Sequence, residues 1–195
     1  MEINNTFYRL PKREMLEGWA AKVPPEFRFV LKASRRITHF KRLEGVDDET
    51  AYLLDTASAM GDRLGAVFFQ LPPHVQKSTE KLAAFLATLP PVDAGPRVAF
   101  EFRHPTWFDD EIYELLRTRD AAMVFADVDG EEPPVLTPTA SWGYLRLRRE
   151  DYPDEALAAW RAKVEATGWQ EAYVFFKHED DCAGPEMAAR FLALG

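Results

Sequence analysis

The sequence predicts an α/β fold built on a parallel sheet. Short segments rich in aliphatic and aromatic residues alternate with longer segments whose apolar residues recur at helical spacing. Several short segments are apolar on both faces in their middle, as strands buried in parallel sheets are. Strands that alternate with helices imply parallel pairing through helical crossovers. Two closures fit this order, an open doubly wound sheet and a (β/α) barrel.

The strand-like segments are bounded by turn residues, among them several proline pairs. We predict seven strands, at residues 2–7, 28–32, 65–71, 97–102, 121–127, 143–148 and 171–177. No Gly-x-Gly-x-x-Gly motif follows the first strand, so the usual dinucleotide-binding fingerprint is absent. Its absence favours the barrel over the doubly wound sheet.

The helix-like segments carry apolar residues three and four positions apart. The stripes are Met15, Leu16, Trp19, Ala20 and Val23; Leu53, Leu54, Ala57 and Gly61; Leu82, Phe85, Leu86 and Leu89; Ile112, Leu115 and Leu116; Leu157, Trp160 and Val164; and Met187, Phe191 and Leu192. Asp109 is a fitting N-cap for the fourth helix, and Pro153 suits the first turn of the fifth. Residues 128–141 contain three prolines and no helical pattern, and we predict a loop there.

Length and composition narrow the function classes. A chain of 195 residues suits one domain, which we expect to cover residues 1–195. Its 24 basic against 32 acidic residues give a net charge of −8, which disfavours generic binding to polyanions. No apolar run is long enough to cross a membrane, and no signal-peptide layout is visible. Cys182 is the single cysteine, so an intrachain disulfide and a cysteine-rich zinc site are excluded, and we expect a cytoplasmic protein.

Polar residues stand at the carboxyl end of nearly every predicted strand, where parallel α/β folds bind their ligands. They are Glu2 and Asn4 on the first strand, Lys32 on the second, Gln70 on the third, Glu101 and Arg103 on the fourth, Asp127 on the fifth, Arg146 on the sixth, and Lys177 and His178 on the seventh. Buried charges are costly unless paired. We therefore predict a polar ligand pocket, with a self-satisfied ion-pair network as the alternative.

Two of these positions are candidates for catalysis. Glu101 is a candidate general acid or base, although a salt bridge to Arg103 or Arg146 explains it equally well. His104, directly after that strand, is the second candidate. Glu2, Glu101, Asp127 and His104 offer metal ligands, but no ligand spacing supports a metal and four nearby cations oppose it. We expect no metal site, and the residues define no cofactor.

Three further residues have weaker claims. His39 follows a strand, where it belongs either to the pocket rim or to an ordinary loop. Trp107 and Tyr8 offer rings that can stack on a ligand, with packing against the protein as the alternative for each. All three stay candidates for ligand binding.

Four motifs together resemble the YecE-like family, also called domain of unknown function 72. They are Glu2 to Pro11; Phe27-Arg28-Phe29 with Lys32 and Ile37-Thr38-His39; Gln70-Leu71-Pro72-Pro73; and Phe100 to Trp107. The resemblance runs to the C-terminus and implies a TIM-barrel-like fold with a polar pocket at the carboxyl strand ends. It implies no reaction, because the family's biochemistry is not established.

Three departures from the family pattern shape the expectations. Family members usually begin with a further strand and helix before the Glu-Ile-Asn segment, so we expect a seven-stranded barrel, open at its N-terminal side with an unpaired edge. The family's Arg-x-His-Gly is replaced by Arg146-Leu147-Arg148-Arg149, and its Tyr-Phe-Asn-Asn by Phe175-Phe176-Lys177-His178. Both replacements add positive charge, which favours an anionic ligand.

Three functions follow as hypotheses. The first is an enzyme, a hydrolase or isomerase, acting on a small phosphorylated or otherwise anionic substrate. The second is a nucleic-acid-processing barrel in which the same cations bind backbone phosphates. The third is a non-catalytic ligand-binding domain. Neither membrane binding nor a particular oligomeric state is predicted.

Overall fold

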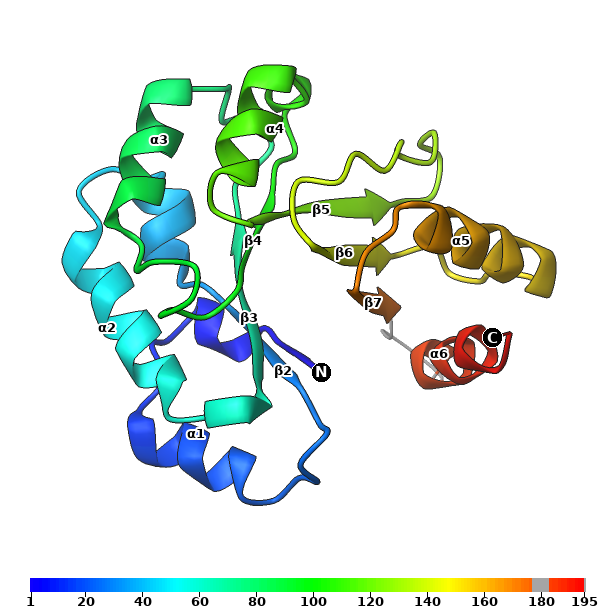
Figure 1. Ribbon diagram of the computed structural model, residues 1–195, viewed down its shortest axis with the longest axis horizontal. Coiled ribbons are helices and arrows are strands. Elements are labelled where there is room, and N and C mark those ends of the chain that lie inside the picture. Colours follow the sequence, from blue (N-terminus) through cyan, green and yellow to red (C-terminus); the bar gives the residue numbers. More distant parts are fainter. Residues whose placement is uncertain (177–182, 195) are drawn as a thin grey trace. The chain divides into compact units, whose positions relative to one another are not determined.

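A computed structural model describes residues 1–176 and 183–194. The chain divides into two compact units, Met1–Ala121 and Ala122–Gly195. Figure 1 shows both as strands accompanied by helices. The predicted strand–helix alternation is present in each.

The first unit holds four parallel strands in chain order. They are β1 (Glu2–Ile3), β2 (Phe29–Lys32), β3 (Leu64–Gln70) and β4 (Val98–Glu101). The accompanying helices are α1 (Arg13–Ala20), α2 (Asp47–Ser58), α3 (Thr79–Thr88) and α4 (Asp110–Arg117). Figure 1 shows α1, α2 and α3 on one side of these strands. Sequential strand order with helices on one side is typical of a barrel, whereas a doubly wound sheet reverses its order.

The two faces of this sheet differ in their side chains. On the helix side, Phe69 of β3 stacks on Phe100 of β4 and meets Phe85 of α3 edge-on. The strand register then assigns Lys32, Gln70 and Glu101 to the other face, because successive strand residues alternate between faces. The candidate polar residues of β2, β3 and β4 therefore share the face turned away from the helices.

The prediction of a strand over residues 2–7 is wrong beyond Ile3. Asn5–Phe7 form a short 3₁₀ helix, η1, in which the Phe7 amide donates to the Asn4 carbonyl. The Thr6 hydroxyl donates to the carbonyls of Ile3 and Lys32, so local bonds replace the strand ladder. Glu2, Asn4 and Thr6 therefore do not share a strand face.

Three other short helical segments interrupt the first unit. They are η2 (Arg36–Phe40), a π-helical turn, η3 (Gly61–Arg63) and η4 (Pro105–Trp107). The π-helical turn lies directly after β2 and carries the Ile37-Thr38-His39 motif. It thus presents this motif at the carboxyl end of the sheet.

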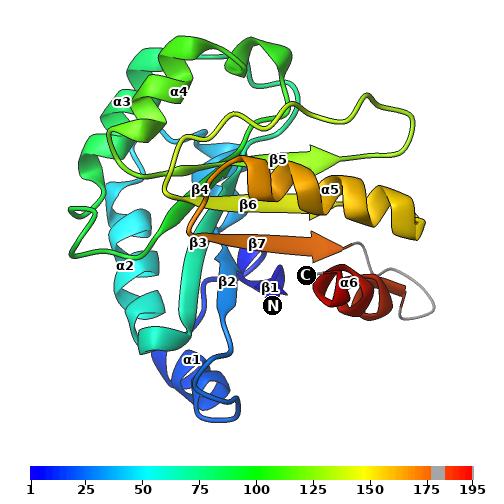
Figure 2. The same ribbon diagram turned by 45° about the vertical axis from the view of Figure 1, so that its right-hand side comes forward.

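The second unit repeats the arrangement on a smaller scale. Its parallel strands are β5 (Ala122–Asp127), β6 (Trp142–Leu147) and β7 (Glu171–Phe176), and its helices are α5 (Asp154–Ala166) and α6 (Ala183–Ala193). Leu145 and Leu147 of β6 share a core with Trp160 of α5 and Phe191 of α6. Figure 2 shows α5 running beside these strands. The helices therefore cover the β6 face that carries Leu145 and Leu147.

The predicted cap of α4 and the predicted loop are confirmed, whereas two helices end before their predicted stripes do: α1 ends before Val23 and α2 before Gly61. The Asp109 side chain accepts a hydrogen bond from the Glu111 amide and so caps α4. Pro153 directly precedes α5, and residues 128–141 contain no helix or strand. Local signals were sufficient here, because capping and proline geometry act within a few residues.

Candidate functional site

Side chains from three neighbouring strands form a continuous hydrogen-bonded series. The Lys32 ammonium, at the end of β2, donates to Gln70 Oε1 at 2.8 Å. The Gln70 amide nitrogen, at the end of β3, donates to Glu101 Oε1 at 2.7 Å. These contacts exist because Lys32, Gln70 and Glu101 occupy the same sheet face at adjoining register positions. The structure thus joins three predicted site residues.

Arg103 completes the series from just beyond β4. Its Nε lies 3.1 Å from Glu101 Oε1, the same oxygen that accepts from Gln70. Glu101 is 1% exposed, whereas the Arg103 side chain is partly in solvent. A buried carboxylate needs such partners, because the desolvation of an unpaired carboxylate costs on the order of several kcal/mol. Arg103 therefore supplies a charged partner for Glu101, and their salt bridge lies at the solvent boundary.

His39 and Phe7 adjoin Lys32. The Lys32 ammonium is 4.5 Å from the centre of the Phe7 ring, and the His39 ring meets that ring edge-on at 4.8 Å. His39 Nδ1 lies 2.9 Å from the Thr38 hydroxyl. Burial lowers the pKa of His39, and the positive charges of Lys32, His74 and Arg103 lower it further. We call Lys32, His39, Gln70, Glu101 and Arg103 the strand-end group.

The structure places three other predicted residues of the first unit, Glu2, Asn4 and His104, as follows. Glu2 is half-buried, and its register position beside Val30 assigns it to the same sheet face as Lys32. Asn4 is exposed and makes no capping hydrogen bond to η1. His104 Nδ1 lies 2.9 Å from the Thr106 hydroxyl and accepts from the Thr106 amide, so its ring caps η4.

Trp107 is a core residue in this structure. It is 2% exposed, its ring stacks on Phe102 at 4.2 Å, and its indole nitrogen donates to the Val75 carbonyl. The face against Phe102 is unavailable to a ligand. Of the two alternatives for Trp107, the structure shows packing.

Asp127 does not join Arg146 in a pocket, because the two lie on opposite faces of their sheet. Asp127 pairs in register with Leu147 on the helix side, whereas Arg146 pairs with Ala126 on the other side. Arg149 binds both oxygens of Asp127, at 2.8 Å each, and the Tyr152 hydroxyl donates to Oδ2 at 2.8 Å. Burial raises the pKa of Tyr152. Asp127 therefore anchors the chain that follows β6.

Arg149 and Tyr152 were not among the predicted site residues. A signal existed for Arg149, because a buried carboxylate needs a cationic partner and Arg149 directly follows a predicted strand, with Tyr152 three residues later. What the sequence lacked was the sheet face of Asp127. Lys177 and His178 lie outside the described residues, and their roles stay predictions.

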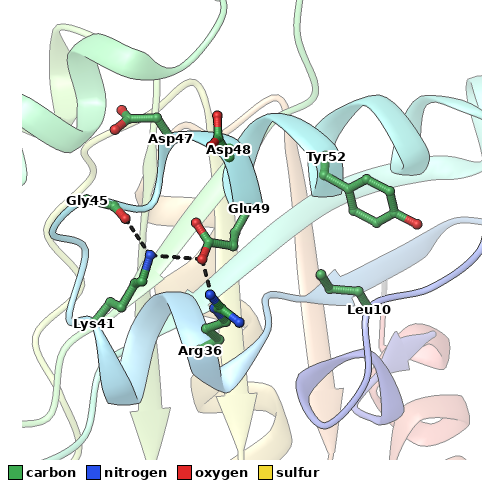
Figure 3. A pocket seen from close by; sticks show the side chains of 8 residues that line it. All are labelled: Leu10, Arg36, Lys41, Gly45, Asp47, Asp48, Glu49 and Tyr52. Carbon is green, nitrogen blue, oxygen red and sulfur yellow. Dashed lines mark hydrogen bonds and ion pairs between the residues drawn. The ribbon is translucent and has the colours of Figure 1, made fainter.

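An open cavity of about 550 Å³ lies beside η2 and the start of α2. Figure 3 shows the side chains that line it. Arg36 and Lys41 from the η2 segment both bind Glu49 Oε1 of α2, at 2.7 and 2.9 Å. Lys41 also donates to the Gly45 carbonyl. The cavity contains none of the predicted site residues in its lining. Because Glu49 already engages both cations and Asp47 and Asp48 stand beside it, the cavity is a poor anion site.

Within residues 1–176 and 183–194, no three His, Cys, Asp or Glu side chains are grouped in a way that would hold a metal ion. None of the helices there is both long enough and apolar enough to cross a membrane.

The profile of the family described as "Protein of unknown function DUF72" matches residues 1–194. The chain belongs to the DUF72 family. This confirms the resemblance that the four motifs indicated. It adds no reaction, since the DUF72 description names none.

Curated DUF72 relatives match part of the chain. The UPF0759 protein YecE of Escherichia coli (strain K12) is 32% identical over 109 residues, which are 55% of this chain and 39% of YecE. The UPF0759 protein YunF of Bacillus subtilis (strain 168) is 28% identical over 120 residues, or 58% of this chain and 42% of YunF. The matches thus span about two fifths of each relative's length.

Solved DUF72 structures match almost the whole chain. A crystal structure of a DUF72 family protein from Enterococcus faecalis V583 has a TM-score of 0.82 at 16% identity, covering 99% of this chain and 83% of that one. One from Thermotoga maritima MSB8 has a TM-score of 0.75 at 24% identity, covering 99% and 82%. At such identities the likeness shows the fold alone. The α/β, TIM-barrel-like fold class is therefore confirmed.

Proposed function

We propose that the strand-end group binds a small anionic ligand, most simply a phosphate monoester. One observation carries this proposal: two cations meet at the carboxylate of Glu101, Lys32 through Gln70 and Arg103 directly. With His39 neutral, these five residues carry two positive charges and one negative charge, and Glu2 on the same sheet face adds a second negative charge. The strand ends are thus near neutral in a chain whose net charge is −8.

The electrostatic surroundings of His39 support the proposal. Burial is the main cause of the lowered pKa of His39, and the positive charges of Lys32, His74 and Arg103 lower it further. The field at this ring is therefore positive, and a ligand with negative charge gains from that field. Arg103, which is partly exposed, offers guanidinium donors of the kind that bind phosphate oxygens in pairs.

Glu101 supplies the candidate chemistry. Its carboxylate is buried at the base of the group, within hydrogen-bond distance of Gln70 and Arg103. A carboxylate in that position can move a proton on a bound substrate. We therefore assign Glu101 the role of general acid or base in a hydrolase or isomerase acting on a phosphorylated substrate. His104 stays a second candidate, and its ring is only half-buried.

The binding test compares two matched lysines. Lys32→Met removes the ammonium that faces Gln70, and Lys41→Met removes one that faces Glu49 of α2. Titration calorimetry with inorganic phosphate and ribose 5-phosphate should show at least about tenfold weaker binding for Lys32→Met, the loss of one charge-assisted contact. Lys41→Met should bind as the parent does. Equal affinities in all three proteins would contradict the proposal.

The catalytic part has its own test. Phosphorus NMR of a panel of sugar phosphates with the parent protein should reveal turnover of at least one, and Glu101→Gln should abolish that turnover while still binding the compound. Binding without any turnover in the parent would instead support the non-catalytic ligand-binding alternative. Turnover that survives in Glu101→Gln would remove Glu101 from the mechanism.

A further inference from the structure

Two aromatic side chains beside the strand-end group are unusually exposed. Tyr8 is 69% exposed and Phe40 is 68% exposed. Tyr8 follows η1 after β1, and Phe40 ends η2 after β2. Scattered exposed apolar residues are ordinary on protein surfaces, so exposure alone indicates nothing. These two, however, share a third residue.

Arg35 lies against both rings. Its guanidinium carbon is 5.6 Å from the centre of the Tyr8 ring and 5.4 Å from that of Phe40. Within residues 1–176 and 183–194, no carboxylate pairs with Arg35. A guanidinium in contact with two exposed aromatic rings adds a positive charge to an aromatic surface. We call Tyr8, Arg35 and Phe40 the aromatic rim.

The rim is joined to the strand-end group through Phe7. The Tyr8 and Phe7 rings meet edge-on at 5.1 Å, and the Lys32 ammonium stands 4.5 Å from the Phe7 ring. Phe7 is held in place because its neighbour Thr6 donates a hydrogen bond to the Lys32 carbonyl at 2.7 Å. Two short contacts thus connect an anion-attracting lysine to an exposed aromatic surface. One small molecule is long enough to contact both.

We propose that the ligand is a phosphorylated nucleoside, whose phosphate binds the strand-end group while its base stacks on the aromatic rim. This inference rests on the proposed function, because the strand-end group must bind the phosphate. Flat, exposed rings and a guanidinium favour an aromatic ring over a plain sugar, since stacking requires a π face. Stacking on the aromatic rim requires a base, but it does not depend on the hydrogen-bonding groups of that base. We therefore expect little selectivity among the bases.

The test compares ligands that differ by one part. Titration calorimetry on the full chain uses adenosine 5′-monophosphate, ribose 5-phosphate and adenosine. Adenosine 5′-monophosphate should bind roughly five- to a hundredfold more tightly than ribose 5-phosphate, the range of one stacked base. Tyr8→Ala and Phe40→Ala should each reduce that advantage and leave the affinity for ribose 5-phosphate unchanged. Tyr52→Ala, which removes another exposed aromatic ring at the cavity of Figure 3, should change neither affinity.

The outcomes separate this inference from the function beneath it. Equal affinities for adenosine 5′-monophosphate and ribose 5-phosphate would contradict base stacking on the aromatic rim and leave phosphate binding by the strand-end group intact. Equal affinities for adenosine 5′-monophosphate and adenosine, with no binding of ribose 5-phosphate, would contradict phosphate binding instead. A short 5′-phosphorylated single strand that binds more tightly than the mononucleotide, with a steep loss in salt, overturns the small-molecule ligand in favour of nucleic acid.

Discussion

Glu101 and Asp127 are each the last residue of a parallel strand, and each is 1% exposed, yet they have different surroundings. Asp127 lies on the helix side of its sheet, and Arg149 and Tyr152 occupy its oxygens. Glu101 lies on the face away from the helices, where a neutral amide and a partly exposed arginine share one of its oxygens. Equal burial therefore does not imply an equal role.

The comparison teaches that partners and sheet face decide what a buried carboxylate does. On the helix side, a charged group is surrounded by core and must be fully paired, which makes it structural. On the other face, at the strand ends, the Glu101 carboxylate lies at the solvent boundary beside a partly exposed arginine. We interpret Asp127 as an anchor and Glu101 as a site residue.

The largest expected effect is on stability at Asp127. Asp127→Asn should lower the free energy of unfolding by about 3 kcal/mol, because the amide nitrogen meets the donors of Arg149 and leaves that charge without its partner. Urea unfolding followed by circular dichroism measures this. A loss no greater than that caused by the same carboxylate-to-amide change at Glu101 would remove the distinction between the two sites.

A smaller loss is expected when only the hydroxyl partner of Asp127 is removed. Tyr152→Phe should cost about 1 to 2 kcal/mol, because it removes two hydrogen bonds, one donated to Asp127 and one accepted from the Arg149 amide, while the ring still packs against Phe176. The same unfolding measurement tests it. Phe176→Leu, which alters that ring contact and keeps the hydroxyl, is the control. A Tyr152→Phe protein as stable as the parent would show that Arg149 alone satisfies Asp127.

Glu101→Gln should cost less than about 1 kcal/mol in stability, since its amide oxygen can still accept from Gln70 and Arg103 is partly exposed. Its effect on turnover should be far larger than its effect on folding. Unfolding curves and the NMR turnover assay, measured on the same preparation, test both halves. A severe loss of stability would place Glu101 with Asp127 as an anchor.

The smallest effect is a pH dependence from His39. Its lowered pKa means that the folded state favours the neutral ring, so the unfolded chain binds more protons as the pH falls below the ordinary value of 6.5. This part of the stability is complete above 6.5 and is lost as the pH falls through the lowered pKa. His39→Gln should flatten that slope in unfolding measured between pH 7.5 and 5. NMR titration of the ring should show a higher pKa once phosphate is bound; an unchanged pKa would mean that His39 does not sense the ligand.

Much of the fold was predictable because its signals are local. Helical stripes, the Asp109 cap and the proline-rich loop at residues 128–141 each depend on neighbours within a few positions. The prediction of the first strand was wrong because a contact between distant residues, and not a local signal, decides the structure of that segment. The Thr6 hydroxyl bonds to the Lys32 carbonyl, 26 residues away, and the segment turns into η1 instead of continuing as a strand.

The sequence predicted the polar character of the candidate site, but only some of its residues. Lys32, Gln70, Glu101 and Arg103 stand at strand ends in the sequence, and the parallel register joins them. Asp127 satisfied the same rule and was misplaced, because the rule counts strand ends and ignores which face the helices cover. A difference of one residue in that alternation moves a side chain to the other side of the sheet.

By itself, the sequence determined the strand–helix order, the family and the polar character of the strand ends, because residue type and spacing carry those properties. Tertiary structure alone decided that Trp107 packs against Phe102, that Arg149 binds Asp127, and that Tyr8 and Phe40 both contact Arg35. These outcomes depend on register and on contacts between distant segments. No local pattern encodes such contacts, since they form only when the helices have packed against one face of the sheet.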